Sequence, residues 1–529
     1  MVEKEEIPLT IDILYPAESI LKNPDSAGYS CLANNGNGGY KMKYEIIGRK
    51  EEIKKLDEIF ASREAEFVAI YGRRRVGKTY LVHQYFNARS CFFFEVTGLK
   101  NGALQTQLEL FTRTVEEAFH KGKITLVKPK RWLDALKLLT DHLRDLPKNK
   151  TIVLFFDELP WLATHKSGIL EAIDYYWNTQ WSKNPMIKLI VCGSAASWML
   201  EKVIYAKGGL YNRMTARIHL LPFTLQEAQD YLKYRGIQLN EAQVLELYMV
   251  MGGIPHYLKA VSRGLSAAQN INKICFEPEG LLLDEFDQLF ASLFDRFEAH
   301  LEIIQALAQA RYGLSRDELL KKIQQSSSGG TFKERLLELE AAGFITSFIP
   351  YGNTSKGTYY RIIDEYTLFY LNWVRKVRGK LLRDNANYWE SKSQSQAWKS
   401  WAGYAYEAVC FKHIRQVCRT LGIEAISKEI GSWRYIPSSE ESKTGTQVDL
   451  LLDRVDGVIN ICEIKHYNKK FTIDKSYANQ LKYKMETFHE QVKTRKQLFL
   501  TMITVHGLVQ NEYAKELVTG EITLKDLFK

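Results

Sequence analysis

The chain reads Gly72-Arg73-Arg74-Arg75-Val76-Gly77-Lys78-Thr79 at the point that decides its fold. This is the spacing G-x-x-x-x-G-K-T of a phosphate-binding loop. The apolar run 67–71 before it predicts a buried strand, and residues 79–86 after it have helical character. Glycines let such a loop wrap a phosphate, while backbone N–H groups and the helix N-terminus point at the anion. The stretch therefore predicts an α/β fold with a P-loop.

The loop residues have expected roles toward ATP. Lys78 would reach the β- and γ-phosphates, and the Thr79 hydroxyl would bind Mg²⁺. Backbone N–H groups of the rest of the loop would surround the phosphates. The nucleotide-binding residues expected in this segment are Gly72, Arg73, Arg74, Arg75, Val76, Gly77, Lys78, Thr79 and Tyr80.

Two later strands are predicted to end beside this loop. Residues 151–158 are an apolar run ending in Asp157 and Glu158. Asp157 would bind Mg²⁺, and Glu158 would orient and deprotonate the attacking water. The strand 187–192 is followed by Gly193 and Ser194, whose hydroxyl could contact the γ-phosphate or the water; an ordinary strand-end turn is the alternative. Lys78, Glu158 and Ser194 are thus the expected catalytic residues of a Mg²⁺-dependent ATPase.

Composition limits the protein class. The 529 residues exceed one hydrophobic core, so several domains are expected. There is no apolar run of 18 or more residues and no signal-peptide core near the N-terminus, which predicts a cytoplasmic protein without membrane contact. Seven scattered cysteines without a C-x-x-C pair argue against disulfides or a zinc site. The net charge of +10 permits nucleic-acid binding without establishing it.

The chain divides at shifts in local pattern. Residues 1–41 are rich in turn-forming residues, and a fresh start follows at Met42. Residues 1–43 are therefore either a loose N-terminal arm or a segment before the true initiator. Strands and helices then alternate, which predicts a parallel sheet covered by helices. We expect an ATPase core at 44–223, a helical lid at 224–290, a winged-helix domain at 291–375, a linker at 376–396 and a last domain at 397–529.

The winged-helix prediction rests on residues 297–363. They read as three helices followed by two strands, 344–349 and 359–363, that flank Gly352 and Asn353 as a wing. Such a domain could bind DNA. The second helix is not strongly basic, which favours a packing and regulatory role.

The last domain contains a second group of polar residues on two predicted strands, 448–453 and 458–465. The length of the intervening turn decides whether their carboxylates meet. A two-residue turn would place Asp449 and Glu463 on opposite faces of the sheet. A three-residue turn, with Gly457 in the left-handed conformation, would place them directly opposite, with Cβ atoms about 5 Å apart.

Two carboxylates at that spacing beside Lys465 predict a divalent-metal site of the nuclease kind. Mg²⁺ or Mn²⁺ would activate water there, and the lysine would position the nucleophile. Glu407, in the helix expected at 397–420, could supply a further ligand. An exposed acidic–basic hairpin is the alternative, but both strands are apolar on both faces, where charges are costly without a reason. The expected metal ligands are Asp449, Glu463 and Glu407, and the expected catalytic residues are Asp449, Glu463 and Lys465.

Residues 44–260 resemble the archaeal-type ATPases of the STAND branch of AAA-related NTPases. The resemblance rests on the two motifs above and on three further segments: Ile47-Gly48-Arg49, Leu210-Tyr211-Asn212-Arg213 and Gly253-Ile254-Pro255. It implies that Gly48, Arg49 and Pro255 contact the nucleotide. Arg213 lies on a loop that could reach a γ-phosphate in its own or a neighbouring subunit, which makes it a further catalytic candidate. The family often has Gly where this chain has Asn212.

Residues 397–529 are similar to the PD-(D/E)xK nuclease-like domains fused behind such ATPases. The similarity is carried by Gly431-Ser432-Trp433, Val448-Asp449, Cys462-Glu463-Ile464-Lys465 and the closing segment 522–528. It implies an α/β domain of the restriction-endonuclease kind. The combined expectation is an ATP-hydrolysing switch, assembled as a homo-oligomer, coupled to a metal-dependent nuclease-like domain acting on nucleic acid, expected to be DNA. A regulatory DNA-binding ATPase with a non-cutting nuclease fold and a DNA-remodelling motor are the alternatives.

Overall fold

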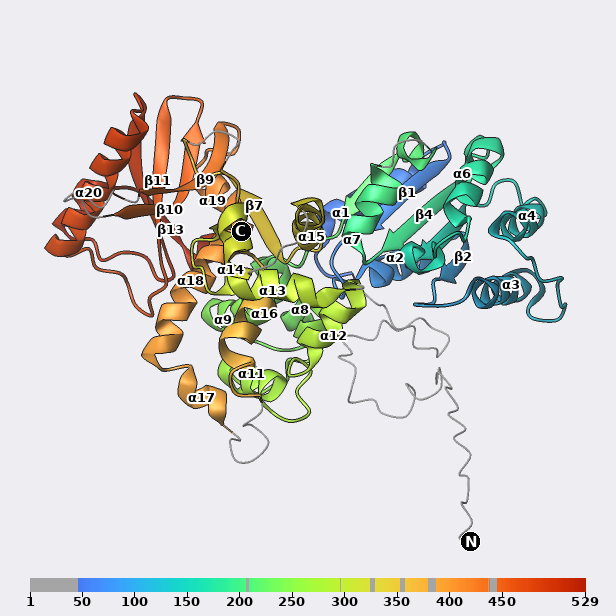
Figure 1. The fold of residues 1–529 in the computed structure, drawn as a ribbon, viewed down its shortest axis with the longest axis horizontal. Coiled ribbons are helices and arrows are strands. Elements are labelled where there is room, and N and C mark those ends of the chain that lie inside the picture. Colours follow the sequence, from blue (N-terminus) through green and yellow to red (C-terminus); the bar gives the residue numbers. More distant parts are fainter. Residues whose placement is uncertain are drawn as a thin grey trace, which may run out of the picture.

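The computed structural model describes residues 46–205, 209–294, 296–323, 329–352, 357–378, 387–435, 437 and 445–529. The predicted N-terminal arm at 1–43 and Asn353 of the predicted wing lie outside these ranges. Two β-sheets lie at opposite ends of the molecule, and a group of helices lies between them (Figure 1).

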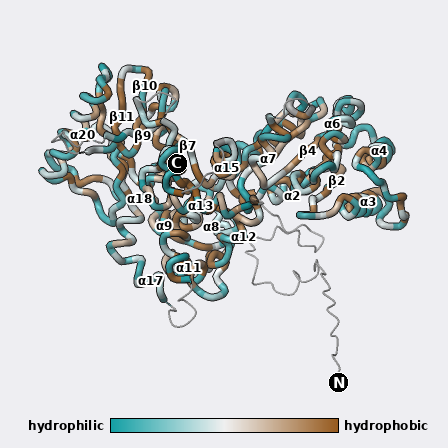
Figure 2. The backbone as a smooth tube through the Cα atoms, viewed as in Figure 1, coloured by the Kyte–Doolittle hydropathy of each residue, from teal (hydrophilic) through white to brown (hydrophobic). Residues whose placement is uncertain are grey.

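The first sheet is the parallel sheet that the sequence predicts. Its order is β2-β3-β4-β1-β5, and every neighbouring pair is parallel. β3 and β4 are buried at every position, as expected for central strands covered on both faces; the strands of this sheet are largely hydrophobic in Figure 2. The strand bounds are Glu66–Tyr71 (β1), Phe92–Thr97 (β2), Ile152–Asp157 (β3), Ile187–Gly193 (β4) and Ala216–His219 (β5). Because β3, β4 and β1 are neighbours, their carboxyl ends meet at one edge.

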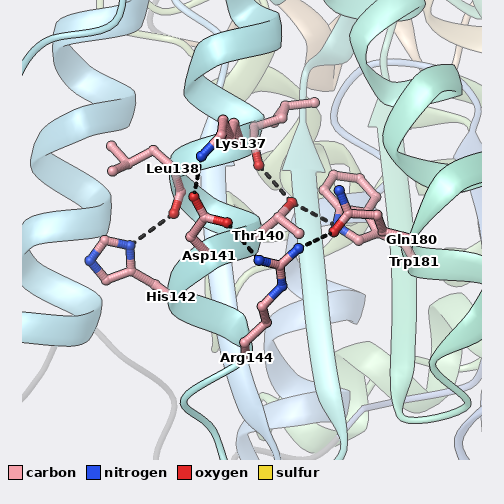
Figure 3. A network of polar contacts seen from close by, with 9 residues as sticks. Lys137, Leu138, Thr140, Asp141, His142, Arg144, Gln180 and Trp181 are labelled. Atoms are coloured by element: carbon pink, nitrogen blue, oxygen red, sulfur yellow. Dashed lines mark hydrogen bonds and ion pairs between the residues drawn. The ribbon is translucent and has the colours of Figure 1, made fainter.

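Helices around this sheet are held by apolar packing and by polar contacts at their ends. Near the end of α4, Arg144 donates to Asp141 and Gln180, and the Trp181 indole donates to Thr140 (Figure 3). This network ties α4 to the segment after α6 and is a packing contact. The helices of the domain are Lys50–Ala61 (α1), Lys78–Asn87 (α2), Leu104–His120 (α3), Trp132–Leu143 (α4), Leu159–Leu162 (α5), Ile169–Thr179 (α6) and Ala196–Trp198 (α7).

The middle of the chain is mainly helical. A capping box starts α8, in which the Thr224 hydroxyl accepts from the Glu227 backbone and the Glu227 carboxylate accepts from the Thr224 backbone. Five helices follow the first sheet: Leu225–Tyr234 (α8), Glu241–Met251 (α9), Pro255–Leu258 (α10), Ala267–Cys275 (α11) and Glu285–Leu293 (α12).

Three helices and a small antiparallel sheet occupy the segment expected to be a winged helix. The sheet order is β6-β8-β7, so the short strand β6 joins the hairpin of β7 and β8. The bounds are Phe297–Ala308 (α13), Leu314–Ser315 (β6), Arg316–Ile323 (α14), Gly329–Ala341 (α15), Ile345–Phe348 (β7) and Tyr359–Ile362 (β8). The α-helix Glu365–Phe369 (α16) and the π-helix Tyr370–Val374 (η6) follow.

The prediction of an irregular linker at 376–396 is wrong for part of its second half. Residues Tyr388–Lys392 form helix α17, and Trp389 within it is completely buried. The Trp389 ring stacks on Phe276, and its backbone N–H donates to Asn272. The polar residues around Trp389 suggested a loop, but one buried tryptophan anchors this segment to α11.

The last domain is built on a mixed five-stranded sheet of order β13-β12-β11-β10-β9. β9, β10 and β11 are antiparallel, whereas β11, β12 and β13 are parallel. Helix α18 contacts β11 and helix α20 contacts β10. The bounds are Gln396–Lys412 (α18), Ile414–Thr420 (α19), Ser427–Tyr435 (β9), Thr446–Arg454 (β10), Val458–Lys465 (β11), Lys475–Val492 (α20), Gln497–Thr504 (β12), Glu512–Leu517 (α21), Val518–Thr523 (β13) and Leu524–Phe528 (η7).

Candidate functional site

The P-loop joins β1 to α2 as the motif predicts. Gly72 has φ 146°, and a Cβ there would lie 2.2 Å from the Leu220 carbonyl oxygen. Gly77, at φ 94°, precedes the first residue of α2. The Lys78 ammonium is buried and donates to the carbonyl oxygens of Gly72 (2.9 Å) and Arg73 (3.1 Å). It therefore lies across the loop that would receive the phosphates.

The predicted magnesium ligands are adjacent. The Thr79 hydroxyl donates to Asp157 Oδ2 over 2.7 Å, and Asp157 Oδ1 accepts from the Glu158 backbone over 3.0 Å. Hydroxyl and carboxylate oxygens suit Mg²⁺, which usually keeps several waters and takes few protein ligands. Thr79 and Asp157 therefore fit a magnesium ion bound together with nucleotide phosphates.

Glu158 and Ser194 are brought into direct contact. Glu158 Oε2 accepts from both the backbone N–H (3.0 Å) and the hydroxyl (2.9 Å) of Ser194. Glu158 also has a left-handed backbone, with φ 47°, which costs about 1–3 kcal/mol for a residue with a side chain. Strain of this kind persists only where the surroundings impose it, and here it directs the carboxylate toward the end of β4.

Arg49 links three parts of the ATPase domain. Its guanidinium donates to the carbonyl oxygens of Leu221 (2.6 Å) and Val76 (3.0 Å) and lies 4.5 Å from the Phe223 ring centroid. Its backbone N–H donates to Glu227. Burial lowers the pKa of Arg49, although Glu227 opposes this. Arg49 thus fixes the P-loop against the start of α8.

Gly48 and Pro255 are the other nucleotide contacts that the resemblance implies. Gly48 has φ 67°, and a Cβ there would meet the Glu227 carboxylate at 2.5 Å. Pro255 begins α10 directly after Ile254. Gly48 therefore packs closely against α8, and contact of Gly48 or Pro255 with a nucleotide stays a prediction.

Two P-loop arginines turn away from the loop. Arg73 is buried in an ion pair with Asp364, with Nη2 3.1 Å from Oδ2. Arg75 Nη2 lies 2.9 Å from Glu285 Oε2. Both carboxylates belong to the helical part beyond the ATPase sheet. The side chains of Arg73 and Arg75 are thus engaged elsewhere, which leaves their backbone N–H groups for the phosphates, and their contact with a nucleotide stays a prediction.

The Arg73 ion pair continues into the last domain. Asp364 also accepts from the Thr367 backbone and caps α16. The next residue, Glu365, pairs with the Lys412 ammonium at 2.5 Å, and both side chains are largely buried. Burial lowers the pKa of Lys412, and Glu365 opposes this. We call Arg73, Asp364, Glu365 and Lys412 the interdomain charge network.

The hairpin of the last domain has the three-residue turn. Gly457 has φ 84°, and the register pairs Leu450 with Cys462 and Asp453 with Ile459. The next pair outward in this register is Asp449 and Glu463. Of the two turn lengths, the structure therefore has the one that brings these carboxylates to the same level.

Glu463 is the centre of this second site. It is 4% exposed and accepts from Lys465 (2.8 Å) and the Tyr477 hydroxyl (2.7 Å), and it pairs with Lys484. Burial would raise its pKa, but Lys484 and Lys465 outweigh this and lower it to about 2. Sequence reasoning missed Tyr477 and Lys484; their seven-residue spacing, which puts them on one helix face, was the available signal.

Asp449 has the opposite electrostatic environment. Burial and the neighbouring carboxylates Glu463 and Glu407 raise its pKa to about 7. Its Oδ2 accepts from the Ile464 backbone at 3.3 Å. Glu463 is thus charged, whereas the neighbouring Asp449 is readily protonated. This difference is expected when two carboxyl groups lie close together, because the charge of one disfavours ionisation of the other.

The expected third metal ligand, Glu407, lies near Asp449, but its carboxylate is paired with Arg311. Glu407 accepts from Arg311 over 2.6 Å, which ties α18 to the segment after α13. Among the residues that the structure describes, no three or more His, Cys, Asp or Glu side chains are close enough to hold a metal. Asp449 and Glu463 remain as the residues that would hold Mg²⁺, which is commonly bound by one or two carboxylates with waters. An ion there would compete with Lys465 and Lys484 for Glu463.

One expectation concerns membranes. In the described part of the chain, the helices are too short or too polar to cross a bilayer.

Known proteins resemble the first domain and part of the rest of the chain. Residues 46–261 match the model of an ATPase domain found predominantly in Archaea, which extends past the sheet into the helical part. An uncharacterized protein of Methanocaldococcus jannaschii is 23% identical over 407 residues, covering 77% of this chain and 84% of that protein. The general secretion pathway protein A of Aeromonas hydrophila is 29% identical over 147 residues, or 25% of this chain and 26% of that protein.

Two solved structures are also similar. The Walker-type ATPase of Pyrococcus abyssi has a TM-score of 0.45 and 17% identity, covering 62% of this chain and 96% of that one. The ORC2 protein of Aeropyrum pernix has a TM-score of 0.40 and 16% identity, covering 66% and 96%. Residues 46–261 are thus similar to the archaeal ATPase domains that the family model describes, and that match ends before the last domain.

Proposed function

We propose that this chain is a switch in which ATP hydrolysis at residues 46–261 controls cleavage of nucleic acid by the last domain. The observation that carries the first part is the contact between Thr79 and Asp157 beside the contact between Glu158 and Ser194. Magnesium would be held by Thr79 and Asp157, and it would neutralise charge on the phosphates. Lys78 exchanges its carbonyl partners for phosphate oxygens, and Glu158 takes the proton of the attacking water.

Arg213 provides a test of assembly. It is exposed at the end of the short 3-10 helix Gly209–Arg213 (η5). We propose that it acts on a nucleotide of a neighbouring subunit. Arg213→Ala is expected to slow phosphate release about a hundredfold or more, as for other arginines that stabilise transferred phosphate. Arg113→Ala, an exposed arginine on α3, should leave the rate unchanged.

The mixing experiment separates two roles of Arg213. Combining Arg213→Ala with Lys78→Ala protein restores partial hydrolysis if the arginine acts across subunits of a homo-oligomer. Absence of recovery assigns Arg213 to its own subunit, and an unchanged rate in Arg213→Ala contradicts any catalytic role.

A second activity is supported by the carboxylate pair of the last domain. Asp449 lies level with Glu463, and Lys465 contacts Glu463. These carboxylates would hold Mg²⁺ or Mn²⁺, which supplies an activated water and stabilises charge on a phosphodiester. Lys465 orients the attacking water beside the metal. The substrate is nucleic acid, expected to be DNA; a non-cutting DNA-binding domain and a remodelling motor are the rival proposals.

The interdomain charge network couples the two activities in this proposal. Arg73 belongs to the P-loop, and its carbonyl oxygen is one of the two that Lys78 would give up on meeting phosphate. The Arg73 side chain is buried against Asp364. The adjacent Glu365 pairs with Lys412 at the end of α18, the helix that contacts β11 of the second site. A change at the P-loop therefore reaches the second sheet through buried charges that water screens poorly.

Asp364→Asn tests the coupling. The amide still accepts from the Thr367 backbone, but Arg73 loses its counter-charge. We expect the free energy of unfolding to fall by about 3 kcal/mol, because a buried charge is left unpaired, and cleavage to lose its dependence on ATP. Urea unfolding and cleavage with and without ATP measure the two effects.

A matched control and a rescue complete this test. Asp134→Asn breaks an exposed ion pair with Arg131 and should change neither quantity. The double variant Arg73→Met, Asp364→Asn should recover stability but not ATP dependence. Cleavage that still responds to ATP in Asp364→Asn contradicts coupling through this network.

A further inference from the structure

A chain of aromatic rings leads from the surface to Glu463. Tyr467 lies two residues after the end of β11 and is 54% exposed. Its ring centroid is 6.1 Å from that of Phe471, which is 5.3 Å from that of Tyr477, and both contacts are edge-on. The Tyr477 hydroxyl in turn donates to Glu463. An exposed aromatic face is thus joined to the candidate cleavage site by direct ring contacts.

The segment that carries Tyr467 is anchored. Phe471 forms a parallel bridge with Leu508; its N–H donates to the Gly507 carbonyl at 2.8 Å, and its carbonyl accepts from Val509 at 2.9 Å. β11 ends at Lys465, so the backbone of residues 466–471 is held at both ends. A ring on a backbone held in this way loses little conformational freedom when it stacks on a ligand.

The charges beside this ring favour an anion. Lys469 and Lys470 follow Tyr467 closely and are exposed, and Lys475 is exposed at the start of α20. Lysines interleaved with an exposed aromatic ring are the combination that proteins use to bind single-stranded nucleic acid, in which bases stack on the ring and phosphates meet the cations.

We propose that Tyr467 is a stacking platform for an unpaired base, and that the substrate of the second site is nucleic acid with a single-stranded segment at the scissile phosphate. The proposal rests on the function proposed above for Asp449 and Glu463. A base inside a duplex has both faces covered by its neighbours, so only an unpaired or terminal base offers a face to Tyr467. Lys469 and Lys470 hold the adjoining phosphates and do not distinguish single strands from duplexes.

The test uses the full chain carrying Asp449→Ala, so that binding is measured without cleavage. Fluorescence anisotropy compares a labelled oligodeoxythymidine with a labelled duplex of the same length. Tyr467→Ala is expected to weaken single-strand binding about tenfold or more, the loss found when a stacking ring is removed. Duplex binding should change less than about twofold, because phosphate contacts remain. Tyr467→Phe should bind as the parent does.

Two controls identify the source of any loss. Tyr175→Ala removes a ring of similar exposure from α6 of the ATPase domain and should leave both affinities unchanged. The double variant Lys469→Ala, Lys470→Ala should weaken the binding of both probes and reduce the dependence of binding on salt concentration. Equal loss on both probes in Tyr467→Ala, or no loss on the single strand, overturns the proposal.

The two proposals fail in different ways. Cleavage of duplex and single strand at equal rates by the wild-type chain overturns the stacking platform and leaves the cleavage function standing. Absence of cleavage of any probe with Mg²⁺ or Mn²⁺, together with a single-strand affinity that depends on Tyr467, overturns the cleavage function while supporting the platform.

Discussion

Glu158→Gln is expected to bind ATP as the wild type does and to lose at least about a hundredfold in turnover. The amide oxygen of Gln can still accept from Ser194, so the geometry at the end of β4 is kept. The amide cannot take a proton from water, and general bases contribute about 10²–10⁴ to rates. Phosphate release in steady state and binding of a fluorescent nucleotide measure the two quantities separately.

Two further variants serve as controls for this result: one should lose nucleotide binding and the other should keep normal turnover. Lys78→Ala should lose binding itself, because its ammonium is the main counter-charge to the phosphates. Glu95 lies on the neighbouring strand β2 and pairs with His83. The variant Glu95→Gln should therefore keep normal turnover. Equal turnover in Glu158→Gln and wild type would refute the role of Glu158 as the base.

Asp449→Ala is expected to abolish metal-dependent cleavage while nucleic-acid binding survives or improves. The variant removes one of two carboxylates that would hold the metal, and it also removes negative charge that repels phosphate. Lys465→Ala should lose cleavage with metal binding retained, since the ammonium orients water and is no metal ligand. Cleavage with Mn²⁺, calorimetric metal binding and probe affinity report these effects independently.

The control for this site lies on the same hairpin. Asp456 is exposed at the turn and pairs with Arg454, so Asp456→Asn should keep both cleavage and metal binding. If Asp449→Ala cleaves as the wild type does, the metal site is elsewhere or the activity comes from a contaminant. If the wild type binds nucleic acid but never cuts it, the non-cutting rival is favoured.

The sequence predicts most of the ATPase edge, because motif residues follow buried strands whose order places them together. Strands β1 to β4 of this sheet are confirmed, whereas β5 was not predicted. Of the two hairpin registers that the sequence left open at Gly457, the structure has the three-residue turn. Contacts between segments that are distant in the sequence could not be predicted. The partner of Arg73 lies 291 residues away, and a loop motif says nothing about where its variable side chains turn. The burial of Trp389 was not predicted, because its neighbours in the sequence are polar and a single buried side chain gives no hydrophobic periodicity.

Helix α18 has a consequence for how the protein can be divided. Its last residue, Lys412, neutralises the buried Glu365, and the next residue, His413, accepts the backbone N–H of Leu225 at the start of α8. A chain cut near residue 396 would leave Glu365 without its counter-charge and the α8 N-terminus without this acceptor. Each unsatisfied buried group costs about 1–3 kcal/mol. The ATPase domain and the last domain therefore do not behave as independent modules, because Lys412 and His413 of the last domain satisfy buried groups outside it.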